Sequence, residues 1–169
     1  MALTGTLPEG FESADGIAWG SRREGLLEIV YWNHKRKNSV TGKGQRRMML
    51  LVEGAQNDEN VKVIFIHGGL FYGAGNDLSA LAKMQSAEPD ELRDSASLGS
   101  ELIMVQCLKA INRSKKPVVG LVRGQSIGIS FTTMALFDFI YVSPDAQFST
   151  PFMKSFQSPE GGSTRTFVQ

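Results

Sequence analysis

The chain has 169 residues, which is enough for one domain with a hydrophobic core, and its 41% hydrophobic and 21% charged residues are ordinary values for a globular protein. A formal net charge of +1 provides no overall field that would attract nucleic acid or an anionic membrane. The single cysteine, Cys107, excludes an internal disulfide, and no apolar run is long enough to span a membrane.

The first third of the chain predicts a polar lead-in, two strands and a helix. Residues 1–15 lack the basic and long apolar regions of a secretory signal, so we expect a protein that is not secreted. The stretch "GIAWGSRREGLLEIVYWN" predicts two strands that turn at "SRREG", because residues 29–32 are β-branched or aromatic. After the basic loop "HKRKNSVTGK", Thr41 is positioned as the N-cap of a helix through "GQRRMMLLVEGA".

The middle of the chain alternates between strand and helix patterns. The run "VKVIFIHGG" predicts a strand covered on both faces, and "GGLFYGAGND" predicts a glycine-rich turn before a short helix at "LSALAKMQ". The acidic stretch "SAEPDELRDSAS" is typical of a surface segment. After it, apolar residues three or four apart predict a helix. These residues are Leu98, Leu102, Val105, Leu108 and Ile111.

The last part continues the same alternation. "PVVGLVRG" predicts a second buried strand, "QSIGISFTTMALFDF" a tight turn that enters a helix, and "FIYVS" and "AQFS" short strands. Repeated helix and strand units predict an α/β fold with parallel pairing through right-handed crossovers. Cys107 lies in an apolar helical pattern and is expected to be an inert buried thiol. His34 and His67 have no second ligand at a spacing that would form a metal site, and His67 is expected to be structural.

Two segments share one design, in which a buried strand is followed by a turn of small residues and then a helix. The first turn is "GGLFYGAG" and the second is "GQSIG". The first N–H groups of a helix have no internal partners, so two such ends could together hold an oxygen that becomes anionic during a reaction. Equally, both turns could simply reverse the chain. Neither turn has the pattern of a P-loop or of a dinucleotide-binding turn.

The motifs "FYGAGNDLSAL" and "KPVVGLVRGQSIGISFTTMALFDFIYVSPDAQFSTPF" resemble the crotonase family, the enoyl-CoA hydratases and isomerases. The resemblance implies a crotonase-like spiral core of ββα units over residues 16–169. It also implies binding of acyl-CoA thioesters without a separate cofactor, with the thioester oxygen held by the backbone N–H groups of Asn76 and Ile129. Matching motif positions imply further contacts with the substrate at Ala74, Gly75, Asp77, Leu78 and Gly128.

The acidic residues distinguish the reactions within this family. Its hydratases use two glutamates to add water, but the matching positions here are Thr132 and Phe152. Hydration is therefore disfavoured. The segments "AGNDL" and "FQSPEGG" resemble those of peroxisomal-type Δ3,Δ2-enoyl-CoA isomerases, and that resemblance implies that Glu160 is the catalytic acid/base.

One carboxylate is sufficient to move a double bond, because it can remove a proton at C2 and deliver it at C4. An apolar wall around Glu160 would raise its proton affinity, and the candidates for that wall are Phe131, Phe152, Met153 and Phe156. Another interpretation is structural: Ser158, Pro159 and Glu160 also match the N-cap and first two positions of a helix. Both interpretations are compatible.

The loop "NHKRKNSVT" resembles the family's loop along the pantetheine and the nucleotide phosphates. Lys35, Arg36 and Lys37 could therefore contact CoA phosphates, or they could form a solvated basic loop. Asp77 is expected to cap or orient the first turn, and Asp138 to end its helix.

Members of this family continue with a C-terminal helical segment that packs over the active site and often builds a trimer. We expect this chain to lack that segment and to leave apolar surface uncovered. By resemblance we expect a homo-oligomer, a trimer, that isomerises acyl-CoA substrates during β-oxidation in peroxisomes or mitochondria. The alternative is a non-catalytic crotonase-like module that binds acyl-CoA or a protein partner, as in chromodomain-Y-like proteins.

Overall fold

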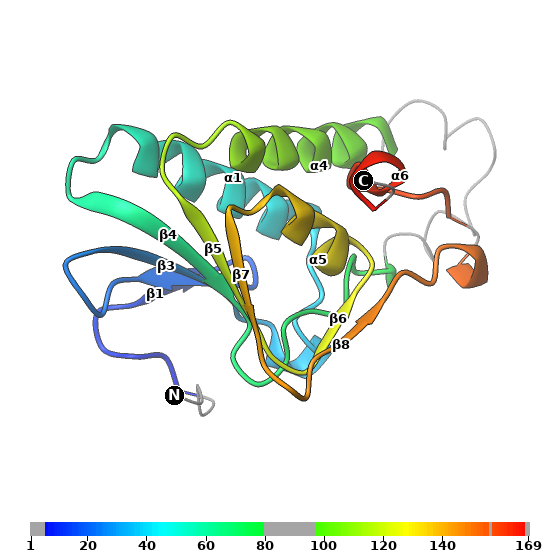
Figure 1. Ribbon diagram of the computed structural model, residues 1–169, viewed down its shortest axis with the longest axis horizontal. Helices are drawn as coiled ribbons and strands as arrows, with labels where there is room; N and C mark the ends of the chain where they lie inside the picture. Colours follow the sequence, from blue (N-terminus) through cyan, green and yellow to red (C-terminus); the bar gives the residue numbers. More distant parts are fainter. Residues whose placement is uncertain (1–5, 80–96, 156, 168–169) are drawn as a thin grey trace.

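A six-stranded sheet forms the centre of the structure, a computed structural model that describes residues 6–79, 97–155 and 157–167 (Figure 1). The strand order is β1-β2-β3-β4-β5-β7. The bounds are β1 Glu12–Ala14, β2 Ile17–Gly20, β3 Gly25–Tyr31, β4 Val61–His67, β5 Val118–Val122 and β7 Phe139–Val142. From β1 to β3 the pairing is antiparallel, and from β3 to β7 it is parallel.

The sheet confirms the predicted strand pair near residues 17–31 and the predicted parallel crossovers. It also contains a strand that the composition did not indicate. Glu12–Ala14, within the polar lead-in of residues 1–15, forms β1 by pairing with β2. At the opposite edge all four residues of β7 are exposed, among them Phe139 and Tyr141.

The long helices α1 (Gly42–Asn57) and α4 (Ser97–Asn112) pack against each other on one side of the sheet (Figure 1). As predicted, Thr41 is the N-cap of α1, and its hydroxyl accepts a hydrogen bond from the N–H of Gly44 at 3.1 Å. Met48, Val52 and Ala55 are buried at helical spacing. They join Ile29 and Ile64 of the sheet in the main core.

The predicted helix near residue 105 is confirmed as α4, which buries only part of its apolar surface. Leu102 is 57% exposed and Val105 is 39% exposed, whereas Cys107 and Ile111 are buried. Apolar residues occur on more than one face of this helix, so spacing alone could not identify the face that packs on α1. The predicted helix "LSALAKMQ" and most of the acidic segment that follows it lie outside the described residues.

A second, smaller layer holds the C-terminal part. Strands β6 (Gln125–Ile127) and β8 (Gln147–Ser149) pair in parallel, and the short helices α5 (Ile129–Thr132) and η2 (Thr133–Leu136) follow β6 directly. Beyond β8 are η3 (Met153–Ser155) and α6 (Ser163–Thr166), and η1 (His34–Arg36) lies in the basic loop. In the view of Figure 1, α6 is drawn at the side where α4 begins.

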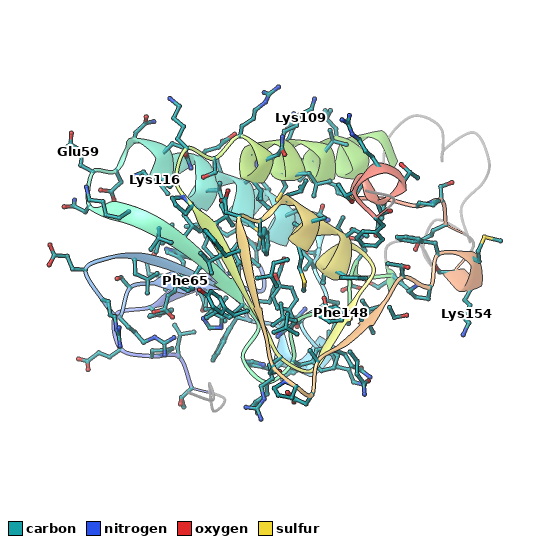
Figure 2. All side chains as sticks on the ribbon, in the orientation of Figure 1. Glu59, Phe65, Lys109, Lys116, Phe148 and Lys154 are labelled. Carbon is teal, nitrogen blue, oxygen red and sulfur yellow. The ribbon has the colours of Figure 1, made fainter. Side chains whose placement is uncertain are left out.

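Charged side chains such as Glu59, Lys109 and Lys154 lie at the periphery (Figure 2). Inside, a second small core of Phe11, Ala18 and Val30 covers the sheet face opposite α1. Among the described residues, no helix has the length and apolar character that a membrane crossing requires.

One charged cluster is buried beside this second core. Glu28 of β3 is 4% exposed and accepts bidentate hydrogen bonds from Arg22, and His67 Nε2 lies 3.4 Å from its Oε2. Burial by itself would raise the pKa of Glu28, but the hydrogen bonds from His67 and Arg22 outweigh it and lower the pKa to about 2. The buried His67 thus has a structural partner, in agreement with its predicted role.

We expect Glu28→Gln to reduce the free energy of unfolding by about 2 kcal/mol at pH 7, because Arg22 and His67 lose an ionised partner. The folded-state pKa lies below the ordinary value of 4.5, so the carboxylate stabilises the fold above pH 4.5 and loses this effect as the pH falls toward 2. Urea unfolding should therefore show a smaller difference between variant and parent at pH 3. Glu24→Gln, at an exposed position nearby, is the control. An equal difference at both pH values would contradict this assignment.

Candidate active site

The two glycine turns predicted from the sequence lie against each other. Gly73 pairs with Ser126 of β6, since its N–H donates to Gln125 and its carbonyl accepts from Ile127. Gly75, at φ +85°, approaches so closely that an added Cβ would lie 2.8 Å from the carbonyl oxygen of Ile127. Only glycine permits this backbone contact, and the contact places Asn76 beside Gly128 and Ile129.

Among the described residues, two backbone N–H groups at this junction have no backbone acceptor. The Val40 N–H donates to the Gly75 carbonyl, and the Asp77 N–H donates to the Val40 carbonyl. The bridge between Val40 and Asn76 therefore uses backbone groups of the residues before and after Asn76, but not the Asn76 N–H itself. Within the described residues, the Asn76 N–H has no acceptor of its own. Ile129 is the first residue of α5, where an N–H has no partner inside the helix.

Glu160 extends into this junction from the C-terminal loop. Its Oε2 accepts a hydrogen bond from Asn76 Nδ2 at 3.1 Å, and the Ile129 N–H also donates to the carboxylate. An added Cβ on Gly128 would lie 3.7 Å from Oε1. Burial raises the pKa of Glu160 above its ordinary value, and the hydrogen bonds from Asn76 and Ile129 partly offset that rise. The structure therefore brings together Asn76, Ile129 and Glu160.

The structural interpretation of Glu160 as a first-turn helix residue is wrong. Helix α6 begins at Ser163, after Gly161 and Gly162 at φ +67° and +76°. Two left-handed residues cannot belong to a right-handed helix, so Ser158 and Pro159 do not cap one. The pair instead turns the chain over α5, where Gly161 packs directly on the buried side chain of Thr132.

Asn76 is oriented by a residue that sequence reasoning missed. Gln45 of α1 is 7% exposed, and its Nε2 donates to Asn76 Oδ1 at 2.9 Å. The sequence does indicate that Gln45 is unusual, because this polar residue stands three positions before Met48 on the apolar face of α1. Ser130 was also missed; its buried Oγ accepts from the Gly75 N–H at 3.2 Å and ties the two turns together.

The basic loop is attached to the first turn. Arg36 forms a 2.7 Å ion pair with Asp77, so this expected phosphate contact already has a partner. Asp77 also accepts from the Ser79 N–H, in agreement with its predicted orienting role. Lys37 lies over the Phe71 ring at 5.9 Å, and Lys35 is exposed.

Asn38 holds this loop in place, and the sequence did not single it out. It is 1% exposed at φ +56°, and its Nδ2 donates to the carbonyls of Gly68 and Phe71 at 2.9 and 2.6 Å. Its own Oδ1 accepts from the Asn33 N–H. Asn tolerates the left-handed conformation that the loop requires at this position.

The expected apolar wall is only partly present. Met153 is 88% exposed, so its side chain is not part of a wall. Phe152 is buried, and its carbonyl accepts the Gln157 N–H at 2.9 Å, which anchors the loop leading to Glu160. The ring of Phe131 lies between the tilted rings of Phe148 and Phe167, with centroid distances of 4.8 and 4.9 Å. Phe156 lies outside the described residues. Leu78, an expected contact, is half exposed, and Ala74 is half-buried.

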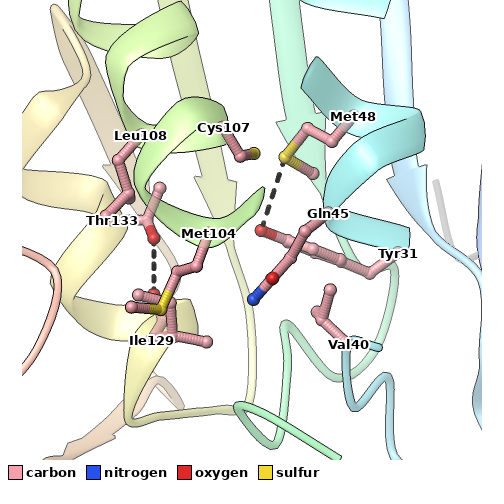
Figure 3. A pocket seen from close by; sticks show the side chains of 9 residues that line it. All are labelled: Tyr31, Val40, Gln45, Met48, Met104, Cys107, Leu108, Ile129 and Thr133. Carbon is pink, nitrogen blue, oxygen red and sulfur yellow. Dashed lines mark hydrogen bonds between the residues drawn. The ribbon is translucent and has the colours of Figure 1, made fainter. Parts of the chain in front are cut away.

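A small, mainly apolar cavity of about 20 Å³ adjoins the junction (Figure 3). Side chains from β3, α1, α4, α5 and η2 point into it. They belong to Tyr31, Val40, Gln45, Met48, Met104, Cys107, Leu108, Ile129 and Thr133. Ile129 thus contributes its N–H to the junction and its side chain to the cavity. Burial raises the pKa of Cys107 to about 12, which fits the inert thiol predicted from the sequence.

In the described ranges, no three His, Cys, Asp or Glu side chains gather in a way that could hold a metal ion. The chemistry that this arrangement can supply is one carboxylate next to two backbone N–H donors.

Comparison with known proteins agrees with this geometry. A family profile described as "Enoyl-CoA hydratase/isomerase" matches residues 21–169. Enoyl-CoA delta isomerase 2 of Rattus norvegicus is 30% identical over 165 residues, which cover 94% of this chain and 41% of that protein. Enoyl-CoA delta isomerase 3, peroxisomal, of Mus musculus is 30% identical, with 85% and 44% covered. The chain thus spans less than half the length of these relatives.

A solved structure supports the same fold. A putative enoyl-CoA hydratase/carnithine racemase from Magnetospirillum magneticum AMB-1 is 28% identical and superposes with a TM-score of 0.75, covering 92% of this chain and 57% of that one. The α/β spiral predicted from the sequence is therefore confirmed.

The contact of Gly161 with Thr132 predicts a measurable difference between two neighbouring glycines. Gly162→Ala should reduce the free energy of unfolding by about 1 kcal/mol, because φ is positive but nothing lies within 4 Å of the new Cβ. Gly161→Ala should cost about 1–3 kcal/mol more, since its Cβ would collide with Thr132. Urea unfolding measures both variants. Equal losses would mean that the loop does not pack on α5 as described.

Proposed function

The chain belongs to the enoyl-CoA hydratase/isomerase family, and we propose that it is the catalytic part of a Δ3,Δ2-enoyl-CoA isomerase. The observation on which this proposal rests is the position of Glu160. Its carboxylate lies next to the side chain of Asn76 and the N–H of Ile129. The proposed base thus lies beside the two residues whose backbone N–H groups are the proposed donors.

In the proposed reaction the thioester carbonyl oxygen of a 3-enoyl-CoA accepts hydrogen bonds from the N–H groups of Asn76 and Ile129, and the Ile129 N–H exchanges its bond to Glu160 for this one. Glu160 removes a proton from C2, and the C–H electron pair forms a dienolate whose negative oxygen is stabilised by the two donors. The protonated Glu160 then delivers that proton to C4. The double bond ends between C2 and C3, and Glu160 is again a carboxylate.

Two features favour isomerisation over hydration. First, hydration in this family uses two glutamates, and Thr132 occupies one of those positions while Phe152 occupies the other. Second, Thr132 is fully buried under Gly161, so a glutamate side chain at position 132 would displace the loop that carries Glu160. A site with one acid can return the abstracted proton but lacks the second group that would activate water.

The cavity beside Ile129, at about 20 Å³, has room for about one water molecule, so the proposal does not place the acyl chain of the substrate inside it. Lys35, which is exposed, and Lys37 are the proposed partners of the CoA phosphates, while Arg36 positions Asp77. The proposal extends to a homotrimer that acts in β-oxidation in peroxisomes or mitochondria; a related mouse protein has "peroxisomal" in its name.

We expect Glu160→Gln to lower kcat for conversion of a 3-enoyl-CoA to the trans-2-enoyl-CoA by at least about 100-fold, because the amide cannot accept the proton. The absorbance of the conjugated thioester measures turnover, and calorimetry should show that CoA binding changes little. Glu59→Gln, at an exposed position far from Glu160 in the sequence, is the matched control. Undiminished turnover in Glu160→Gln would remove this residue from the mechanism. Acyl-CoA binding without turnover in the parent would instead indicate a non-catalytic module.

The reaction should also depend on pH in a defined direction. The base is the ionised carboxylate, and burial holds the pKa of Glu160 above the ordinary value of 4.5. We therefore expect kcat to decline as the pH falls through this raised pKa, at a pH above 4.5. A rate profile measured from pH 4 to 8 tests this. A kcat that stays constant down to pH 4 would contradict the assignment.

A further inference from the structure

A chain of hydrogen bonds leads from α1 to Glu160. Gln45 Nε2 donates to Asn76 Oδ1 at 2.9 Å, and Asn76 Nδ2 donates to Glu160 Oε2 at 3.1 Å. Gln45 is buried, and its side chain also borders the apolar cavity together with Met48 and Met104 (Figure 3). A buried amide in such surroundings is costly unless it is hydrogen-bonded, so its contact with Asn76 is expected to persist.

The chemistry of the three side chains fixes the direction of this chain. An ionised carboxylate only accepts hydrogen bonds, so Asn76 must present its NH₂ group to Glu160. The oxygen of the same amide then lies on the Gln45 side and needs a donor. Gln45 supplies that donor through Nε2. If the Asn76 amide rotated by half a turn, oxygen would face the carboxylate and NH₂ would face NH₂.

We propose that Gln45 is a positioning residue that fixes the orientation of the Asn76 amide and so keeps an N–H donor on the carboxylate of Glu160. Its consequence for turnover rests on the proposed isomerase function, but the orientation of Asn76 does not. Burial raises the pKa of Glu160, and the hydrogen bonds from Asn76 and the Ile129 N–H lower it. A change at Gln45 should therefore reach Glu160 through Asn76.

The first variant is Gln45→Met, which keeps a similar length and removes the donor among neighbours that are already apolar. Asn76 then loses the bond that holds its amide, its donation to Glu160 weakens, and the pKa of Glu160 rises. On the acid limb of the rate profile we expect kcat to fall about fivefold to tenfold with little change in KM, because less of Glu160 is ionised there. The acid limb of the rate profile should move to higher pH.

The decisive test is a double-mutant cycle that does not depend on activity. The pKa of Glu160 is measured by NMR titration of protein containing glutamate labelled with ¹³C at its carboxyl group, and the Glu160→Gln variant assigns the signal. Four proteins are compared: the parent, Gln45→Met, Asn76→Ala, and the double variant. Asn76→Ala removes the side-chain amide but keeps the backbone N–H. Gln106→Met, on the exposed face of α4, is the matched control.

We expect Gln45→Met to raise the pKa of Glu160 in the parent but to have no further effect in the Asn76→Ala background. An unchanged pKa in Gln45→Met would overturn the proposal. An equal rise in both backgrounds would also overturn it, because Gln45 would then act on Glu160 without Asn76. If circular dichroism shows that Gln45→Met does not fold, Gln45→Leu is the second variant, with the same expected outcome. A protein that gives the expected cycle but no turnover would contradict the proposed function while supporting this inference.

Discussion

The close backbone contact between residues 73–76 and residues 125–128 is the constraint on which the rest of the site depends. Gly75 and Gly128 both adopt positive φ, and no side chain fits between the strands at Gly75. Because of this contact, Asn76 and Ile129 lie close together although they are more than fifty positions apart in sequence. Ser130 and Asn38 reinforce it, one between the two turns and the other between the first turn and the basic loop.

The carboxylate of Glu160 comes from the C-terminal loop, and two opposing effects of its surroundings determine its pKa. Burial favours the protonated form of Glu160, while Asn76 and the Ile129 N–H favour the ionised form. The proposed proton shuttle is favoured by a pKa closer to the working pH than that of an exposed glutamate, and burial shifts the pKa of Glu160 in that direction. The buried Glu28 shows the contrast, since Arg22 and His67 hold it ionised and leave it no freedom to exchange protons.

Much of the fold could be predicted from the sequence because its signals are local. Each of these signals depends on residues close together in sequence. They are the apolar runs of β4 and β5, the cap at Thr41 and the glycines of both turns. Features that depend on distant partners could not be predicted this way. β1 exists because it pairs with β2, and the buried face of α4 is selected by α1. At Glu160 the Ser-Pro-Glu pattern suggested a helix start, but the conformations of Gly161 and Gly162 place that start at Ser163.

The dependence on a distant partner also explains why the sequence indicates Asn76 but not Gln45. A catalytic motif marks groups that would contact the substrate, whereas an amide one bond further away is visible only when its partner is known. A polar residue on an otherwise apolar helix face nevertheless carries information, because burial without a hydrogen bond would destabilise the fold. Here the partner is the side chain that contacts the carboxylate. The helix that supplies the core of the protein therefore also determines which end of the Asn76 amide faces Glu160.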